Sequence, residues 1–343
     1  MKFCVYGAGN TGHALSAYLA SKGADFVLYT RDPQKAETLR QHGLESAGAI
    51  AGHFAIEASA DLEKLIPEVD YILVMTTANA HKDAAARLKP LLRQGQKVLI
   101  FNSNWGAFEF MQILGQDVRS KQLTVAETAA QLFVGNLTEP GKVTMNVKSS
   151  VSISATEPSK TAGLIDALRN VFPQFLPAES IIATTLSSTN PVIHVPISIL
   201  NLVRIENRQP FLFYGEGVSG KAVENILHID AERVALGRAL GCHVDDVLTA
   251  INSFWEVKHD NLFDALTKNT TYLKTQGPAS LSHRYFTEDV PYGIAPIAKI
   301  GKLFGLATPY TDRLLDYLKS LMGGKLELDA MYFAKEDFAS LVP

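Results

Sequence analysis

Short apolar runs alternate with segments of helical periodicity along the first half of the chain. The runs are predicted to be strands buried on both faces, because their apolar residues are continuous rather than alternating. Strands that alternate with helices in this way predict a parallel sheet covered by helices. The expected strands are Lys2–Tyr6, Asp25–Tyr29, Tyr71–Met75 and Lys97–Phe101, with shorter ones at Leu123–Ala126, Val143–Val147 and Ser150–Ser154, and the expected helices begin near Thr11, Pro33 and Ala80.

Beyond about Ile181 the strand pattern fades and long helical segments follow. Because 343 residues exceed the size at which one hydrophobic core usually keeps growing, two domains are expected. The prediction is an α/β domain with a mainly parallel sheet at residues 1–180 and an all-α domain at residues 181–343. The helices of the second domain are expected at Pro191–Ile205, Lys221–Leu240, Val244–Trp255 and Pro309–Met322.

A glycine-rich turn joins the first predicted strand to the first helix. Its Gly-x-Gly-x-x-Gly spacing is the fingerprint of dinucleotide-binding Rossmann domains: the first glycine permits the tight turn, the second lets the backbone approach the pyrophosphate, and the third lets the helix pack closely on the strand. The helix N-terminus then offers free N–H groups to the phosphates. The residues expected to bind the dinucleotide are Gly7, Ala8, Gly9, Asn10, Thr11 and Gly12.

The end of the second strand bears on the choice of cofactor. NAD-specific domains place a carboxylate there for the ribose hydroxyls, whereas this chain has Thr30-Arg31-Asp32-Pro33. Thr30 can donate a hydrogen bond to the 2′-phosphate of NADP, and Arg31 can pair with that phosphate or be an ordinary surface charge. Asp32 followed by proline fits a helix cap. NADP(H) is therefore the preferred cofactor, and NAD(H) stays open.

Two loops follow later strands, at the edge where open α/β sheets bind ligands. Thr76 begins the loop after Tyr71–Met75, and Asn104 lies in the loop Asn102-Ser103-Asn104-Trp105-Gly106. Both residues are expected beside the nicotinamide half of the cofactor.

Polar residues form a single stripe on the otherwise apolar helix that begins near Pro191. A stripe of this kind is costly against a dry core, so it is expected to face a cleft. Histidine suits proton transfer near neutral pH, which makes His194 the candidate general acid/base, although a hydrogen-bonded core histidine is the alternative. The stripe residues expected to bind substrate are Asn190, Ser198 and Asn201.

A second polar cluster precedes Val290 and Pro291. Asp289 can hold the histidine tautomer and stabilise its protonated form, and Arg284 can grip a substrate carboxylate with its two-pronged guanidinium. A solvated turn with a helix cap is the alternative for these charges.

Together these segments resemble the octopine/nopaline-type opine dehydrogenases, NAD(P)-dependent enzymes with a 6-phosphogluconate-dehydrogenase-like C-terminal domain. The motifs that carry the resemblance are Gly7-x-Gly9-x-x-Gly12-His13-Ala14, Asn190-Pro191-x-x-His194-x-Pro196, Tyr214-x-Glu216-Gly217, Arg284-Tyr285-x-x-Glu288-Asp289-Val290-Pro291-Tyr292-Gly293 and Gly305-x-x-Thr308-Pro309.

The resemblance implies a reversible, NADPH-dependent condensation of an amino acid with a 2-oxo acid, followed by reduction of the imine. It implies that His194 and Asp289 handle the proton and that Arg284 binds the oxo-acid carboxylate. The loop containing Trp105 lacks the expected glycine-rich form, which leaves the two substrates unidentified.

Two other functions remain open. A ketopantoate-reductase-like enzyme would reduce a 2-oxo acid without an amine and typically uses a lysine, for which Lys221 is the one candidate. A non-catalytic NADP(H)-binding sensor would bind the cofactor without turnover.

Composition narrows the partners. A formal net charge of −3 gives no reason to expect a nucleic-acid partner, and no apolar segment approaches the roughly 20 residues needed to span a membrane. The two cysteines, Cys4 and Cys242, form no disulfide framework, and the dispersed histidines indicate no metal site. We therefore expect a cytoplasmic enzyme with small-molecule substrates, and the apolar helices leave a homodimer open.

Overall fold

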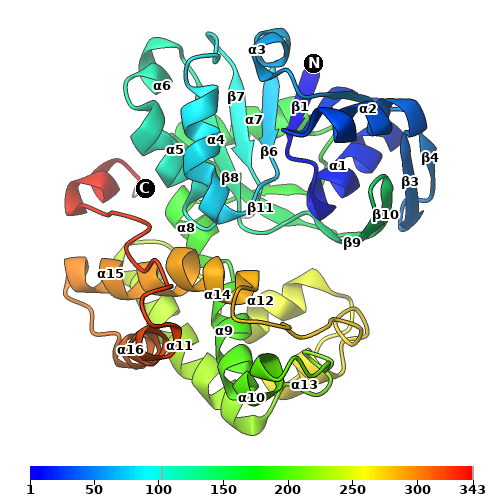
Figure 1. Ribbon diagram of the computed structural model, residues 1–343. Helices are drawn as coiled ribbons and strands as arrows, with labels where there is room; N and C mark the ends of the chain where they lie inside the picture. Colours follow the sequence, from blue (N-terminus) through cyan, green and yellow to red (C-terminus); the bar gives the residue numbers. More distant parts are fainter. Residues whose placement is uncertain (102, 342–343) are drawn as a thin grey trace. The chain divides into compact units, whose positions relative to one another are not determined.

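The computed structural model describes residues 1–101 and 103–341 and divides into two compact units, Met1–Thr185 and Leu186–Pro343 (Figure 1). The first unit holds a mostly parallel sheet with helices and the second is helical, which confirms the predicted fold class. The division falls after Thr185 rather than after residue 180, because the hydroxyls of Thr184 and Thr185 donate to the buried carboxylate of Glu127 in the first unit. Residues 342–343 of the expected second domain lie outside the described residues.

The large sheet of the first unit has the strand order β12-β11-β8-β7-β6-β1-β2-β5. All neighbours pair in parallel except β11 and β8, which are antiparallel. The carboxyl ends of β1, β2, β6 and β7 therefore meet at one edge, where the two polar loops and the glycine turn begin. The strands are β1 (Lys2–Tyr6), β2 (Asp25–Tyr29), β5 (Glu57–Ser59), β6 (Tyr71–Val74), β7 (Lys97–Ile100), β8 (Thr124–Thr128), β11 (Val151–Ala155) and β12 (Phe175–Pro177).

The helices of the first unit connect these strands. Several were not anticipated, since α5 and α7 follow short loops without strong cap residues. They are α1 (Asn10–Ser21), α2 (Pro33–His42), α3 (Leu62–Leu65), α4 (His81–Leu88), α5 (Gly106–Leu114), α6 (Asp117–Ser120), α7 (Thr161–Leu168) and α8 (Ile181–Leu186).

A second sheet of order β4-β3-β10-β9 was only partly predicted. It consists of β3 (Leu44–Gly48), β4 (Gly52–Phe54), β9 (Phe133–Glu139) and β10 (Lys142–Val147). Both β9 and β10 lie far along the chain from β3, which pairs with β10 in parallel. Helix α1 packs against the large sheet and also against β9 and β10, so it is enclosed by both sheets.

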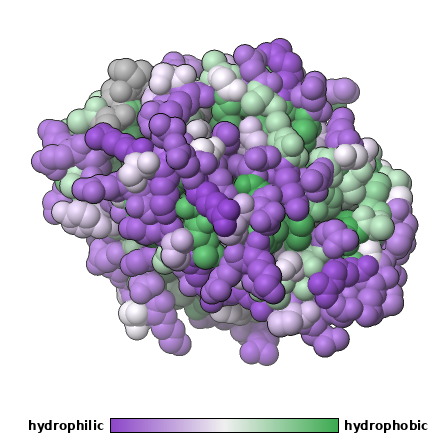
Figure 2. Space-filling model, turned by 90° about the horizontal axis from the view of Figure 1, so that it is seen from above, coloured by the Kyte–Doolittle hydropathy of each residue, from purple (hydrophilic) through white to green (hydrophobic). Residues whose placement is uncertain are grey.

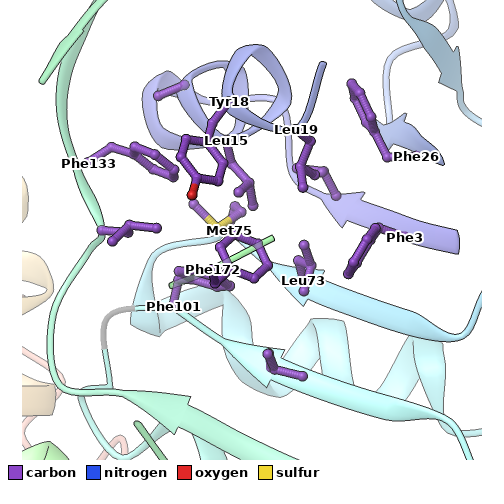
Figure 3. Close-up of a cluster of buried hydrophobic side chains, with 14 of the residues drawn as sticks. Phe3, Leu15, Tyr18, Leu19, Phe26, Leu73, Met75, Phe101, Phe133 and Phe172 are labelled. Atoms are coloured by element: carbon purple, nitrogen blue, oxygen red, sulfur yellow. The ribbon is translucent and has the colours of Figure 1, made fainter. Parts of the chain in front are cut away.

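The apolar face of α1 explains why this helix is so deeply buried. Leu15, Tyr18 and Leu19 point into a cluster with Phe3 of β1 and Leu73 of β6 (Figure 3). Burying aromatic and aliphatic side chains of this size contributes roughly 1.5–3 kcal/mol each. This packing fixes α1, and with it the glycine turn at its N-terminus.

The second unit is built from helices, and the long helix expected at Pro191–Ile205 is broken in two. Helix α9 ends at Leu200 and α10 begins at Leu202, with Asn201 between them in a non-helical conformation. The helices are α9 (Asn190–Leu200), α10 (Leu202–Glu206), α11 (Gly220–Ala239), α12 (Val247–Phe254), α13 (Leu262–Thr267), α14 (Arg284–Thr287), α15 (Ala295–Phe304) and α16 (Pro309–Met322), with a π-helical turn, η4 (Val290–Ile294), before α15.

The surface seen in Figure 2 is mostly hydrophilic, with hydrophobic residues in separate areas. Within the described part of the chain, every helix is too short or too polar to cross a lipid bilayer.

Candidate active site

The glycine turn has the geometry that a dinucleotide phosphate requires. Gly7 has a φ of +120°, and a Cβ on Gly12 would lie 1.8 Å from the carbonyl oxygen of Gly7. A Cβ on Gly9 would meet nothing within 4 Å, so this side of the turn is open to a ligand. Gly9 also precedes α1 without supplying a side-chain cap, which leaves backbone N–H groups at the helix N-terminus for the pyrophosphate. The residues present therefore fit a dinucleotide cofactor.

A pocket of about 440 Å³ lies beside this turn. Tyr6 and Tyr29 form one part of its wall, with their ring centroids 4.9 Å apart. The expected cap is present, since Asp32 Oδ1 accepts hydrogen bonds from the backbone N–H groups of Gln34 at 2.9 Å and Lys35 at 3.2 Å. The lining residues are Tyr6, Gly7, Ala8, Tyr29, Thr30, Arg31, Asp32, Lys35, Thr76, Ala80 and Asp83.

Two cationic side chains line this pocket: Arg31, which follows β2, and Lys35 of α2. The side chain of Arg31 is 71% exposed and its guanidinium lies 3.8 Å from the carboxylate of Asp83. Lys35 donates to the carbonyl oxygen of Ala8 at 2.6 Å. Thr30 Oγ1 accepts from the backbone of Asp32 at 3.3 Å, which leaves its hydroxyl hydrogen free to donate. Thr30 and Arg31 thus lie together in one pocket.

The two loops expected beside the nicotinamide differ in their surroundings. Thr76 lines the pocket, and its buried hydroxyl has no partner among the described residues. Asn104 is 3% exposed and does not line it. Asn104 and Trp105 both adopt positive φ values, of 44° and 62°, which non-glycine residues rarely do. Asn102 of the same loop lies outside the described residues.

His194 is the centre of the polar cluster in the second unit. Its Nδ1 lies 2.7 Å from Oδ2 of Asp289, and its Nε2 lies 3.2 Å from the hydroxyl of Tyr214. His194 and Asp289 are 4% and 1% exposed, so their contact is shielded from water. Because a carboxylate only accepts hydrogen bonds, Nδ1 carries the hydrogen and Nε2 is the nitrogen that can exchange a proton.

The sequence brings these residues together through a close approach of η4 to α9. A Cβ on Gly293 would lie 2.3 Å from the ring of Pro191, so a larger residue would push the two elements apart. Asp289 directly precedes η4, and His194 follows Pro191 by three residues. Single π-helical turns often occur at functional sites, and this one aims Asp289 at His194.

Aromatic rings enclose the histidine. The ring of Tyr285 stacks on His194 with centroids 4.0 Å apart, and the guanidinium of Arg284 lies 5.3 Å from the centre of the Tyr285 ring. Burial lowers the pKa of His194, although the bond to Asp289 acts in the opposite direction. His194 is therefore mainly neutral near pH 7 and can accept a proton.

Arg284 is half exposed and pairs loosely with Glu288, at 3.5 Å. Neighbouring charges, Asp289 first among them, outweigh its burial and raise the pKa of Arg284, so it stays cationic. Its guanidinium is thus available to a carboxylate from solution.

The other residues of the polar stripe differ in their burial and hydrogen bonds. Ser198 is fully buried, and its hydroxyl has no partner among the described residues. Asn201 donates from its amide to the carbonyl oxygens of Ile197 and Gly217, each at 2.8 Å. Asn201 thus joins the end of α9 to the turn at Gly217, and its assignment as a substrate contact stays a prediction. Asn190 is partly exposed at the start of α9.

Sequence reasoning missed two residues at these sites. Tyr214 lies in the motif Tyr214-x-Glu216-Gly217, yet only the fold brings its hydroxyl to His194. Lys35 lies one turn after the Asp32 cap, on the side of α2 that faces the pocket. The motif itself was the available signal for Tyr214, and the spacing from Asp32 was the signal for Lys35.

Two family models match successive parts of the chain. Residues 3–157 match ketopantoate reductase PanE/ApbA, and residues 177–322 match the alpha-helical domain of NAD/NADP octopine/nopaline dehydrogenases. A Rossmann unit with an open glycine turn and a helical unit with a His–Asp pair define an NAD(P)-dependent dehydrogenase.

Known proteins narrow the class. The chain is 29% identical to the opine dehydrogenase of Arthrobacter sp. (strain 1C) over 93% of this chain and 90% of that one. The resemblance inferred from the motifs is therefore confirmed, and the chain is an opine dehydrogenase-like oxidoreductase.

Solved structures agree in fold. Octopine dehydrogenase with NADH and L-arginine matches at a TM-score of 0.77 and 20% identity over 99% of this chain and 94% of that one. NADP+-bound yersinopine dehydrogenase matches at a TM-score of 0.74 and 12% identity over 99% of this chain and 97% of that one.

Proposed function

We propose that this enzyme condenses the amino group of an amino acid with the carbonyl group of a 2-oxo acid and reduces the product with NADPH, in a reversible reaction. The observation that carries this proposal is the buried contact of His194 with Asp289, with the cationic Arg284 beside it. The opine dehydrogenase relative and the octopine dehydrogenase structures with L-arginine and with pyruvate support these substrate classes.

Each residue has a distinct task in this reaction. The nicotinamide supplies the hydride when the cofactor is bound. His194 takes and returns the proton at Nε2, and Asp289 keeps the hydrogen on Nδ1 and stabilises the imidazolium. Arg284 binds the carboxylate of the 2-oxo acid through paired hydrogen bonds. Asn190, Ser198 and Asn201 remain proposed contacts to substrate.

The proposal is tested by following NADPH oxidation with pyruvate and related 2-oxo acids, each with and without an amino-acid mixture. Oxidation that requires both substrates supports the proposal. Oxidation with a 2-oxo acid alone would show the ketopantoate-reductase-like reaction instead. The structure does not favour that alternative, because its lysine candidate, Lys221, is exposed and pairs with Glu224. Binding without turnover would indicate a sensor.

We also propose a preference for NADP(H), because Arg31, Lys35 and Thr30 line one pocket. Arg31→Ala is expected to lower kcat/KM for NADPH about 10–100-fold, the size of a lost charge-assisted hydrogen bond, and to leave NADH nearly unchanged. Steady-state kinetics with both cofactors measures this ratio. Arg87→Ala is the matched control, since Arg87 also pairs with Asp83 but does not line the pocket. Equal losses with both cofactors would contradict the preference.

For Arg284→Ala we expect KM for the 2-oxo acid to rise about 10–100-fold, because the charged hydrogen bonds to its carboxylate are lost. Arg284→Lys is expected to restore little of the affinity, since lysine lacks the planar fork. Arg204→Ala is the control: this guanidinium also lies over a ring, 5.4 Å from the centre of Phe211, and near the carboxylate of Glu216. If KM for the 2-oxo acid in all three variants equals that of the wild type, Arg284 is excluded as the carboxylate ligand.

We propose a cytoplasmic location, because Cys4 and Cys242 are both buried thiols, as expected in a reducing compartment. Cell fractionation tests this location.

A further inference from the structure

The hydroxyl of Tyr214 is hydrogen-bonded to Nε2 of His194, which is the nitrogen that exchanges the proton in the proposed reaction. Nδ1 is taken by Asp289 at 2.7 Å, and Nε2 lies 3.2 Å from the Tyr214 oxygen. A neutral imidazole has one lone pair, here on Nε2, and the phenol O–H donates to it. A substrate therefore cannot make an in-line hydrogen bond to Nε2 while Tyr214 stays in place.

Packing holds Tyr214 where it is. Its ring is 7% exposed, stacks on Tyr272 with centroids 4.8 Å apart and meets Phe213 edge-on at 5.0 Å. Moving the Tyr214 ring aside would disrupt both ring contacts.

The protonation state of Tyr214 suits it to pass a proton. Burial raises the pKa of its hydroxyl well above the usual range, so the phenol remains neutral. A neutral phenol can accept a proton at oxygen while it gives up its own hydrogen.

We propose that Tyr214 is a catalytic residue that passes the proton between Nε2 of His194 and the reacting substrate, so that the chain Asp289–His194–Tyr214 works as a unit. This inference rests on the proposed function. It assigns the contact with the reacting atoms to the phenol oxygen and not to the imidazole.

The proton count of the condensation closes with this assignment. The ammonium group of the amino acid gives one proton to the Tyr214 oxygen as the Tyr214 hydrogen moves to Nε2, which frees the amine to attack the carbonyl carbon. As the N–C bond forms and the π bond of the carbonyl breaks, one proton passes from the nitrogen to the former carbonyl oxygen. The resulting carbinolamine must then lose its hydroxyl. Tyr214 donates its hydrogen to that hydroxyl and recovers one from Nε2, the C–O bond breaks, and the nitrogen lone pair forms the C=N bond. Water leaves, His194 becomes neutral, and the positive charge passes to the nitrogen.

The test compares Tyr214→Phe with Tyr272→Phe. Tyr214→Phe keeps the ring but not the hydroxyl, and is expected to lower kcat at least about 100-fold, with KM values within roughly threefold. The dependence of kcat on the deuterium content of the solvent should be curved for the wild type, because two protons move together, and linear for the residual activity of the variant. Tyr272→Phe, which removes a hydroxyl that does not contact His194, should resemble the wild type in both measurements.

A kcat of Tyr214→Phe equal to that of the wild type would overturn the relay and leave His194 in direct contact with substrate. A measurement independent of turnover is the ¹⁵N shift of Nε2 in the whole protein, which should change in Tyr214→Phe and not in Tyr272→Phe; an unchanged shift would also overturn the proposal. If Tyr214→Phe does not fold, replacing Tyr214 with 3-fluorotyrosine makes the hydroxyl more acidic with little change in size and should change kcat, whereas an unchanged kcat counts against the relay. Failure of the wild type to require both substrates would overturn the proposed function instead.

Discussion

Replacing His194 with alanine is expected to lower kcat/KM of the reductive reaction by a factor of about 10²–10⁴, the usual contribution of a positioned general acid/base. His194 provides the one proton-exchanging nitrogen of the Asp289–His194 pair. The affinity for NADPH should be unchanged, because the cofactor residues lie in the other unit of the chain. Steady-state kinetics and fluorescence titration with NADPH measure the two effects.

A buried carboxylate left without its partner destabilises a protein, so the melting temperature of His194→Ala must be measured alongside the kinetics. Asp289→Asn is the companion variant, because an amide can hold the imidazole in the wrong tautomer while keeping its volume. Since the two residues act as a unit, the double variant should be no slower than the slower single variant. A His194→Ala enzyme that retains most of its activity would exclude this pair as the catalytic group.

The same pair sets an expected pH dependence. Because burial lowers the pKa of His194, the neutral imidazole persists below pH 6.5, about the usual value for histidine. In the oxidative direction, where His194 acts as the base, kcat/KM should stay level down to that pH and fall only below it. The titratable and charged groups that face the imidazole are Asp289, Arg284, His283, Tyr214 and Tyr285. A fall of kcat/KM that begins at clearly higher pH would contradict the assignment of His194 as the base.

Replacing Gly12 with alanine is expected to weaken NADPH binding by at least about 100-fold, which corresponds to some 2.7 kcal/mol. The added Cβ would lie 1.8 Å from the carbonyl oxygen of Gly7, which is a backbone atom and cannot turn aside as a flexible side chain could. The turn must open, and the N–H groups at the start of α1 then move away from the position of the pyrophosphate. Calorimetric titration with NADPH measures the loss.

Gly163→Ala is the matched control for this change. Gly163 lies within α7, and a Cβ there would meet nothing within 4 Å. Alanine is favoured over glycine inside a helix by up to about 1 kcal/mol, so this variant should bind NADPH normally and melt at the same or a higher temperature. Wild-type affinity in Gly12→Ala would show that the glycine turn does not hold the cofactor.

Local chemistry made much of the first unit readable from the sequence. The predicted bounds of β1 and β2 match the structure, because continuous apolar runs specify buried strands. The Asp32 cap before Pro33 was also correct, since it depends only on neighbouring residues. The second sheet was harder to predict: β3 and β4 are short and partly exposed, and the pairing of β3 with β10 joins residues about a hundred positions apart in sequence.

For the candidate site, the sequence by itself determined which residues can do the chemistry. These are a glycine turn that only small residues can form, a histidine suited to proton transfer, and an arginine and an aspartate that lie close to each other along the chain. Only the tertiary structure decided what each one contacts. Asp289 contacts His194, 95 residues away in sequence, because Gly293 lets η4 approach Pro191. The fold also places the hydroxyl of Tyr214 at Nε2 of His194 and the amide of Asn201 at the carbonyl oxygen of Gly217. Local patterns encode residue type and periodicity, whereas hydrogen-bond partners depend on side-chain positions within a few ångströms, which are fixed only when the separate helices pack together.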